Sequence, residues 1–132
     1  MSELQFPLRL NNYFFTHQEA IANPEHKQGE GHELKMHFDV STVVSKIDNE
    51  NSFTLEVTTV INAENSINPS YFIKISAFGI IDVIHDFTSE KVEDLVKSSG
   101  SQVLIGAIRE RIIDLTSRGP WPSISMDFIQ LN

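Results

Sequence analysis

The apolar residues of this sequence recur with two different spacings, and the change between them falls near residue 88. Before this point they alternate with polar residues, because successive side chains of a strand point to opposite faces of a sheet. After it they recur three and four residues apart, which is the spacing of a helix that buries one face. The sequence therefore predicts an α+β fold, in which C-terminal helices pack on one face of a four-stranded antiparallel sheet.

Four segments of the first half alternate in this way, and turn residues separate them. Pro7 in the first segment predicts an edge strand or a bulge, because proline donates no backbone hydrogen bond. The alternation is lost at the consecutive residues Tyr13, Phe14 and Phe15. The polar stretch 17–32 is expected to form a long irregular crossover, and the stretch 48–52 a hairpin turn. The predicted strands are residues 4–11, 33–40, 53–61 and 71–84.

The fourth predicted strand is apolar on both of its faces. One face would carry Tyr71, Ile73, Ile75, Ala77, Ile81 and Val83, and the other Phe72, Phe78, Ile80 and Ile84. Such a strand must be covered on both sides, by helices, by another subunit or by a ligand. This pattern is the first indication of a binding surface.

Two helices are expected in the second half of the chain. The first begins with Thr88 or Ser89 as its N-cap, and Gly100 is expected to interrupt it. The second begins near Ser101 and buries one apolar stripe. Gly119 predicts a left-handed C-cap after this second helix.

Size and charge exclude several classes of protein. A chain of 132 residues is expected to build one hydrophobic core, so we predict a single domain over residues 1–132. The net charge of -8 repels phosphate backbones, which argues against nucleic-acid binding. There is no cysteine, and the most apolar segment, residues 73–84, is too short and too often interrupted for a membrane span. We therefore expect a soluble cytoplasmic protein without membrane insertion.

The residue types that carry out catalysis show no recognisable arrangement. Three of the five histidines lie in or beside the polar crossover and none has the spacing of metal ligands, so exposed loop histidines are expected. Glu110 and Asp114 lie one helical turn apart, but neighbouring arginines would neutralise them, which indicates a solvated charged surface. No serine lies in a Gly-x-Ser-x-Gly motif. The sequence thus predicts a protein that is not an enzyme and holds no metal or cofactor.

Aromatic residues are more numerous than one small sheet face needs. Tyr13, Phe14 and Phe15 are consecutive, so at least one of them points away from any single core face. Phe72, Phe78 and Trp121 add further apolar area. Two interpretations remain open: a large core with an ordinary dimer interface, or a surface that binds apolar segments of other chains.

The stretch from Ala107 to Pro122 resembles the long helix and following turn of the SecB family of export chaperones. The similarity lies in Arg109-Glu110, in Ile112, and in Ser117-Arg118-Gly119 followed by Trp121-Pro122. Upstream, Phe78-Gly79-Ile80 is similar to the glycine-containing fourth strand of the family. Four strands, a long first crossover and then helices also follow the order of the family. The outline covers nearly the whole chain, and the specific motifs cover its last third.

The resemblance implies a homotetramer, a dimer of dimers, that works without ATP. Such a tetramer holds unfolded preproteins in apolar grooves and passes them to the SecA motor. Together with the surplus of aromatic residues, this assigns client binding to Tyr13, Phe14, Phe15, Phe72, Phe78 and Trp121.

Two features depart from the family. Its well-studied members have an acidic residue on the fourth strand that faces SecA, and Lys74 takes that place here. They also carry a further helix and a flexible tail beyond the position of Asn132, so a more open client site is expected. These departures leave open a chaperone dedicated to one partner, like the SecB-like proteins that protect an antitoxin. A third possibility is a homo-oligomer whose aromatic residues are all buried between subunits.

Overall fold

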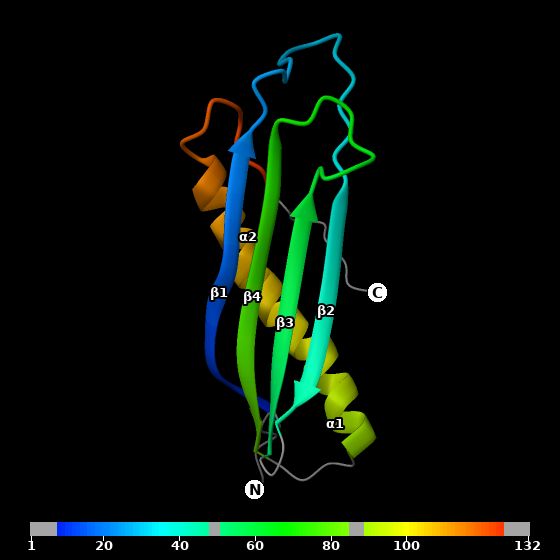
Figure 1. Ribbon diagram of the computed structural model, residues 1–132, viewed down its shortest axis with the longest axis vertical. Coiled ribbons are helices and arrows are strands. Elements are labelled where there is room, and N and C mark those ends of the chain that lie inside the picture. The colour runs from blue at the N-terminus through cyan, green and yellow to red at the C-terminus, as the bar shows by residue number, and fades with distance from the viewer. Residues whose placement is uncertain (1–7, 48–50, 85–88, 126–132) are drawn as a thin grey trace, which may run out of the picture.

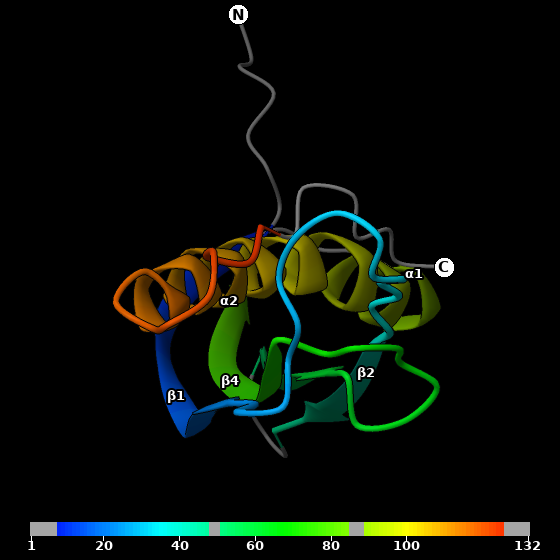
Figure 2. The same cartoon turned by 90° about the horizontal axis from the view of Figure 1, so that it is seen from above.

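A two-layer arrangement of one sheet and one helical segment forms the molecule (Figures 1 and 2). The computed structural model describes residues 8–47, 51–84 and 89–125. The strands are antiparallel and lie in the order β1-β4-β3-β2. Their bounds are β1 Leu8–Ala22, β2 Phe38–Lys46, β3 Ser52–Ile61 and β4 Tyr71–Val83. The predicted fold class is confirmed.

The helical segment crosses one face of the sheet diagonally (Figure 1). It comprises α1 Ser89–Leu95, one turn of π-helix, η1 Val96–Gly100, and α2 Ser101–Thr116. The core lies between it and the sheet, where apolar residues are removed from water. Alternate residues of β3 and β4 supply one side of this core, and the helical segment supplies Val92, Val96, Leu104, Ile105, Ile108 and Ile112. We call the sheet surface opposite the helices the open face.

Strand β1 is much longer than predicted, because it continues to Ala22. Its pairing with β4 shifts register twice, between Leu10 and Asn12 and between Phe15 and His17. Each shift inserts one extra residue and reverses which face the following side chains occupy. The alternation therefore breaks at Tyr13 to Phe15 although the strand does not. The crossover accordingly spans residues 23–37 instead of the predicted 17–32, and residues 4–7 of the predicted strand lie outside the described part.

Strand β2 begins and ends later than predicted. Asn62 has a positive φ of 65° and ends β3, and its N–H donates to the carbonyl oxygen of His37 at 2.8 Å. The His37 N–H donates in turn to the Asn62 side chain at 3.1 Å. Regular pairing therefore starts at Phe38 and runs to Lys46, within the predicted hairpin. Residues 33–37 precede this ladder despite their alternating pattern.

Both glycine predictions for the helical segment are wrong. Gly100 has helical φ and ψ angles and no interruption occurs there. Its hydrogen in place of a side chain lets the helix approach the sheet, since a Cβ atom would lie 2.6 Å from Ile81 Cδ1 and 2.8 Å from Leu55 Cδ2. Gly119 is not left-handed, and it is needed because a Cβ atom there would overlap the Tyr71 hydroxyl. The predicted N-cap Thr88 lies outside the described residues.

No helix in the three described stretches combines the length and the apolar character that crossing a bilayer requires.

Candidate functional site

The helical segment of residues 89–116 lies on one side of the sheet and leaves the open face uncovered (Figures 1 and 2). Apolar side chains on this face include Phe14 and Phe72, which are 46% and 38% exposed. Residues that pair directly across strands share a face, so the register assigns each side chain to one side of the sheet. The even-numbered residues of β4 point to the open face, because its odd-numbered neighbours from Tyr71 to Val83 are buried under the helices. The structure therefore places Phe72, Phe78 and Ile80 on the second face as predicted, but Lys74, Ser76 and Asp82 share that face with them.

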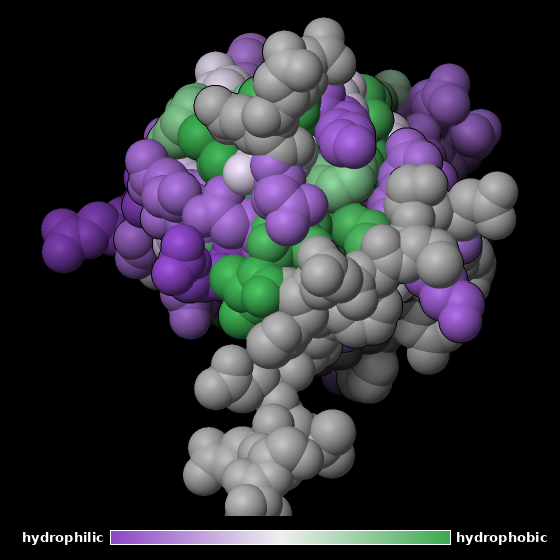
Figure 3. All heavy atoms as spheres, turned by 90° about the horizontal axis from the view of Figure 1, so that it is seen from below, coloured by the Kyte–Doolittle hydropathy of each residue, from purple (hydrophilic) through white to green (hydrophobic). Residues whose placement is uncertain are grey.

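Phe14 and Phe78 form the centre of an aromatic patch on this face. They pair directly across β1 and β4, and their ring centroids lie 5.4 Å apart at an angle of 30°. Ile80 follows on the same face of β4, and Phe14 remains 46% exposed. We call Phe14, Phe78 and Ile80 the aromatic patch. Figure 3, which views the molecule from its lower end, also shows hydrophobic side chains at the surface among hydrophilic ones.

A shallow hollow lies at the other end of the open face. It has a volume of about 210 Å³ and is lined by Glu19, Val60, Phe72 and Lys74, among others. Phe72 is 38% exposed, and Lys74 pairs across the strands with Glu19. The structure thus brings together two of the residues singled out from the sequence, Phe72 and Lys74. The Glu19 carboxylate lies 3.0 Å from Nε2 of His17.

A polar row separates the aromatic patch from the hollow. Its residues are His17, Ser41, Thr58 and Ser76, which follow one another across the sheet. The hydroxyl groups of Thr58 and Ser76 lie 2.8 Å apart and form a hydrogen bond. Phe78 and Phe72 are six residues apart on β4, or about 20 Å at the rise of an extended strand. An extended polypeptide lying along β4 spans the same distance with six of its own residues.

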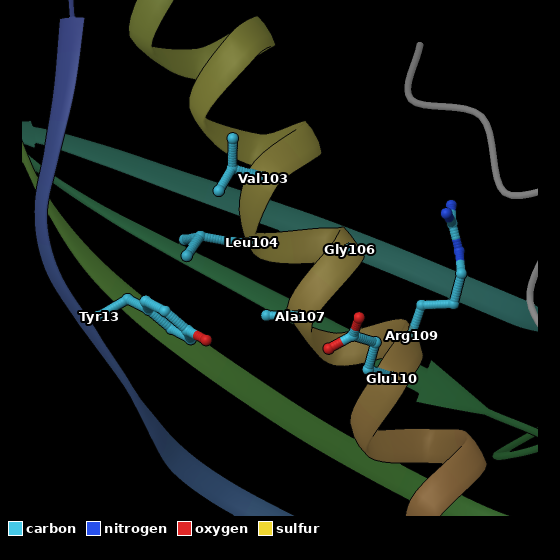
Figure 4. Close-up of a pocket in the computed structure, with 7 residues that line it drawn as sticks. All are labelled: Tyr13, Val103, Leu104, Gly106, Ala107, Arg109 and Glu110. Atoms are coloured by element: carbon cyan, nitrogen blue, oxygen red, sulfur yellow. The ribbon is translucent and has the colours of Figure 1, made fainter.

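Tyr13 and Phe15 lie on the opposite side of the sheet from Phe14. Tyr13 extends from β1 toward α2 and lines a groove of about 370 Å³ with Val103, Leu104, Gly106, Ala107, Arg109 and Glu110 (Figure 4). The Tyr13 and Phe15 rings meet edge to face, with centroids 6.2 Å apart. Phe15 is half-buried and packs against the core. Arg109 points away from Tyr13 in the same view.

Trp121 is held in place by other parts of the chain. Its Nε1–H donates to the carbonyl oxygen of Asn23 at 3.0 Å, and its backbone N–H donates to the Tyr71 hydroxyl at 3.1 Å. The His26 ring lies against the indole, with centroids 4.8 Å apart. These contacts connect the end of α2 to the beginning of the crossover. The six aromatic residues predicted to bind clients therefore occupy three places: the open face, the groove beside α2 and this junction.

His26 is not the exposed loop histidine that the sequence suggests. It is buried at 7% exposure, and its Nδ1 lies 2.8 Å from the carbonyl oxygen of Asn68. Its Nε2 lies 2.7 Å from Oε1 of Gln28. The imidazole thus joins the crossover to the loop before β4. Within residues 8–47, 51–84 and 89–125, no cluster of three or more potential ligands is placed to hold a metal ion.

The charged residues of α2 form the solvated surface predicted from the sequence. Arg111 forms a 3.0 Å ion pair with Asp114, which is 72% exposed, and donates from Nε to Gln18 at 2.6 Å. At the far end of the sheet, Asp82 accepts hydrogen bonds from Ser52 at 2.7 Å, Asn11 at 2.9 Å and Arg9 at 3.2 Å. These contacts, the Ser52 hydrogen bond first among them, hold the pKa of Asp82 below its ordinary value against the opposing effect of burial.

Two exposed apolar residues of the sheet escaped the sequence analysis. Ile21 is 51% exposed and faces the open side next to Phe72, but the predicted crossover included it. Val43 is 60% exposed on β2, beyond the end of the predicted second strand. The signal that would have placed Ile21 is the break in alternation at Tyr13 to Phe15, if it is interpreted as a bulge within a longer strand.

The fold matches that of a known chaperone. A SecB-like chaperone of Mycobacterium tuberculosis, solved in complex with a ChAD peptide from the HigA1 antitoxin, superimposes with a TM-score of 0.69 and 15% sequence identity. The match covers 93% of this chain and 91% of the mycobacterial chain. A protein of unknown function from Streptococcus agalactiae matches with a TM-score of 0.48 and 16% identity, over 92% and 97% of the two chains.

Comparison by sequence finds no counterpart. No protein-family model matches the chain, and no curated protein matches it. The expected SecB-like architecture is thus confirmed by the three-dimensional comparison alone. This chain has the fold of a SecB-like chaperone.

Proposed function

We propose that this protein is an ATP-independent holdase chaperone, which binds unfolded polypeptides through apolar contacts. One observation carries the proposal: Phe14, at the centre of the aromatic patch, is 46% exposed on a sheet face that lies away from the helices. Exposed apolar surface of this kind is typical of interaction sites. The SecB-like fold supports the proposal, since the mycobacterial chaperone with this fold was solved with a bound peptide.

Client contact is assigned to the open face, with Phe14, Phe72 and Phe78 as the principal residues. The aromatic patch and the hollow around Phe72 would each take apolar side chains of an extended segment, and the polar row between them would bind its backbone. Tyr13 faces a separate groove and contributes less. Phe15 and Trp121 act by supporting the fold, since both pack against its core.

The net negative charge of the protein also supports the holdase function. A net charge of -8 keeps a protein with exposed apolar surface soluble and repels other copies of itself. It also favours clients that carry Lys and Arg beside their apolar residues.

Aggregation of a chemically unfolded protein tests the proposal. A urea-unfolded protein of basic charge is diluted into buffer with and without stoichiometric amounts of this protein, and light scattering is followed. Suppressed scattering together with a stable complex in size-exclusion chromatography is the expected result. Full aggregation in the presence of the folded protein would refute the holdase function.

A chaperone dedicated to one partner is the second candidate. It is favoured by the ChAD peptide of an antitoxin in the mycobacterial structure and by Lys74, which reverses the charge expected at a surface that contacts SecA. Pull-down from host lysate separates the two: many unrelated clients indicate a general holdase, and one stoichiometric partner indicates a dedicated chaperone. Delivery to SecA is part of the general-holdase proposal, and adding purified SecA to the client complex tests it.

The proposal includes assembly into a homo-oligomer, a dimer of dimers in the cytoplasm. Strand β1 lies at one edge of the sheet, and an exposed edge gains hydrogen bonds by pairing with a symmetry mate. Light scattering coupled to size-exclusion chromatography measures the mass directly, and a monomer at micromolar concentration would refute this part.

A further inference from the structure

Lys74 presents a positive charge on the open face of β4. Among the residues that the structure describes, no hydrogen bond or ion pair involves its ammonium group, and its side chain is exposed. Glu19 lies directly across from it on β1, but the Glu19 carboxylate lies 3.0 Å from Nε2 of His17 instead. Asp39 shares this face two strands away, on β2 beyond Val60. Lys74 therefore carries a charge with which no described carboxylate pairs.

The side chain of Lys74 also lines the hollow around Phe72. This hollow has a volume of about 210 Å³, and Val60 contributes to its lining. Phe72 is 38% exposed, and Ile21, which pairs with it across the strands, is 51% exposed. An apolar side chain that enters the hollow covers this apolar surface and removes water from the ammonium group of Lys74. Removing water from an ammonium group is unfavourable unless a carboxylate compensates it. The hollow thus favours a ligand with an acidic group beside an apolar one.

The positions of residues along β4 set the spacing of such a ligand. Phe72, Lys74, Ser76 and Phe78 follow one another on the open face at intervals of two residues. A polypeptide segment extended along β4 has the same rise per residue and presents every second side chain to the sheet. When one of its residues lies over Phe72, the residue two positions away lies over Lys74. The residue six positions away then lies over Phe78 in the aromatic patch.

We propose that the open face selects extended client segments with two apolar residues six positions apart and one acidic residue between them, two positions from the apolar residue that enters the hollow. The proposal rests on the chaperone function and names the chemistry of the clients. The acidic side chain pairs with Lys74, and the apolar side chains cover Phe72 and the aromatic patch. The net charge of -8 repels strongly acidic chains, so a single acidic residue in an otherwise neutral or basic segment fits best.

Three fluorescein-labelled peptides of identical composition test the spacing without altering the protein. Each contains two leucines six positions apart, serine and threonine elsewhere, and one aspartate placed two, three or four positions after the first leucine. Because side chains of an extended chain alternate, the aspartate at three points away from the sheet, and the other two reach Lys74 in the two possible directions of the peptide. At least one of these two peptides should bind about fivefold more tightly than the third, which is the effect of an exposed ion pair. Equal affinities of all three in anisotropy titrations would overturn the proposal.

A charge reversal tests the same contact from the protein side. Lys74→Glu should weaken the tightest aspartate peptide by about tenfold and strengthen its lysine analogue, because attraction becomes repulsion. Lys91→Glu is the matched control, since Lys91 is exposed on α1 and its reversal changes the net charge equally; it should change the affinity by less than about twofold. His17→Ala frees the Glu19 carboxylate to pair with Lys74 and should also weaken the peptide. Equal effects of the two charge reversals would contradict a contact at Lys74. Circular dichroism verifies that each variant is folded.

The two proposals fail in distinguishable ways. If the wild-type protein suppresses aggregation but binds the three peptides equally or not at all, the selection of an acidic residue is wrong and the chaperone function stands. If it neither suppresses aggregation nor binds any of the peptides, both proposals are wrong.

Discussion

Phe14 provides the sharpest test of the open face as a client-binding surface. Its side chain is 46% exposed and its inner side packs on Phe78. About 90 Å² of a side chain that buries roughly 200 Å² when fully covered is therefore open to a client. Covering this area at about 25 cal/mol per Å² stabilises the complex by about 2 kcal/mol. Replacing Phe14 by serine should accordingly raise Kd by about 30-fold.

Fluorescence anisotropy measures this change. The client is fluorescein-labelled lysozyme, reduced and carboxymethylated so that it stays unfolded, and it is titrated with wild-type and Phe14→Ser protein. The entropic cost of association is common to both titrations and cancels in their ratio. Because Phe14 lies at the surface of an edge strand, its replacement should leave the helices and the core in place. Circular dichroism and the apparent mass of the variant check this assumption.

A control variant removes a comparable side chain from the other side of the molecule. Val103 is 54% exposed on α2, beside the Tyr13 groove, and Val103→Ser should change Kd by less than about threefold. If Phe14→Ser binds the client as tightly as the wild type, the open face does not bind clients. If Val103→Ser loses affinity instead, the client surface lies on the helical side.

Three further predictions concern the stability of the fold. Tyr71→Phe removes the hydroxyl that bonds to the backbone N–H and C=O of Trp121, at 3.1 and 2.9 Å, and should lower the free energy of unfolding by about 2 kcal/mol in urea titrations. Gly100→Ala should destabilise by about 1 kcal/mol, because crowding of two core methyl groups outweighs the gain in helix propensity, whereas Gly106→Ala, with nothing within 4 Å of its Cβ, should stabilise by up to about 1 kcal/mol. A stabilised Gly100→Ala would contradict the close approach of helix and sheet. Asp82→Asn should destabilise at pH 7, since the lowered pKa of Asp82 means that its charged form stabilises the fold above the ordinary carboxyl range. This difference should shrink in acid-unfolding curves as the pH falls through the lowered pKa of Asp82, and a constant difference would refute the assignment.

The candidate site was predictable in part. The alternation of β4 placed Phe72 and Phe78 on a second apolar face, which needs only the strand period and no knowledge of neighbouring strands. Tyr13 and Phe15 do not share that face, because bulges in β1 decide which of three consecutive aromatic residues faces which side. Trp121 lies elsewhere again, against Asn23. Whether client contact involves these residues stays a prediction.

The lengths of the outer strands were also beyond the sequence pattern. Strand β1 continues past its own alternation because β4 offers hydrogen-bond partners along its whole length. Strand β2 starts where Asn62 turns the backbone of its partner strand, far away in the sequence. The local alternation of apolar and polar residues predicts which face of a strand each side chain occupies. It does not predict where the partner strand begins or ends.

The sequence by itself determined the fold class and the burial of β3, β4 and the helical stripe, because these depend on local periodicity. Tertiary structure alone decided that Gly100 continues the helix, that Phe14 meets Phe78 on the open face and that β2 presents a regular edge. Each of these depends on strand register and on the distance between helix and sheet. Register and close approach arise from contacts between residues remote in the sequence, so they exist only once the chain has folded.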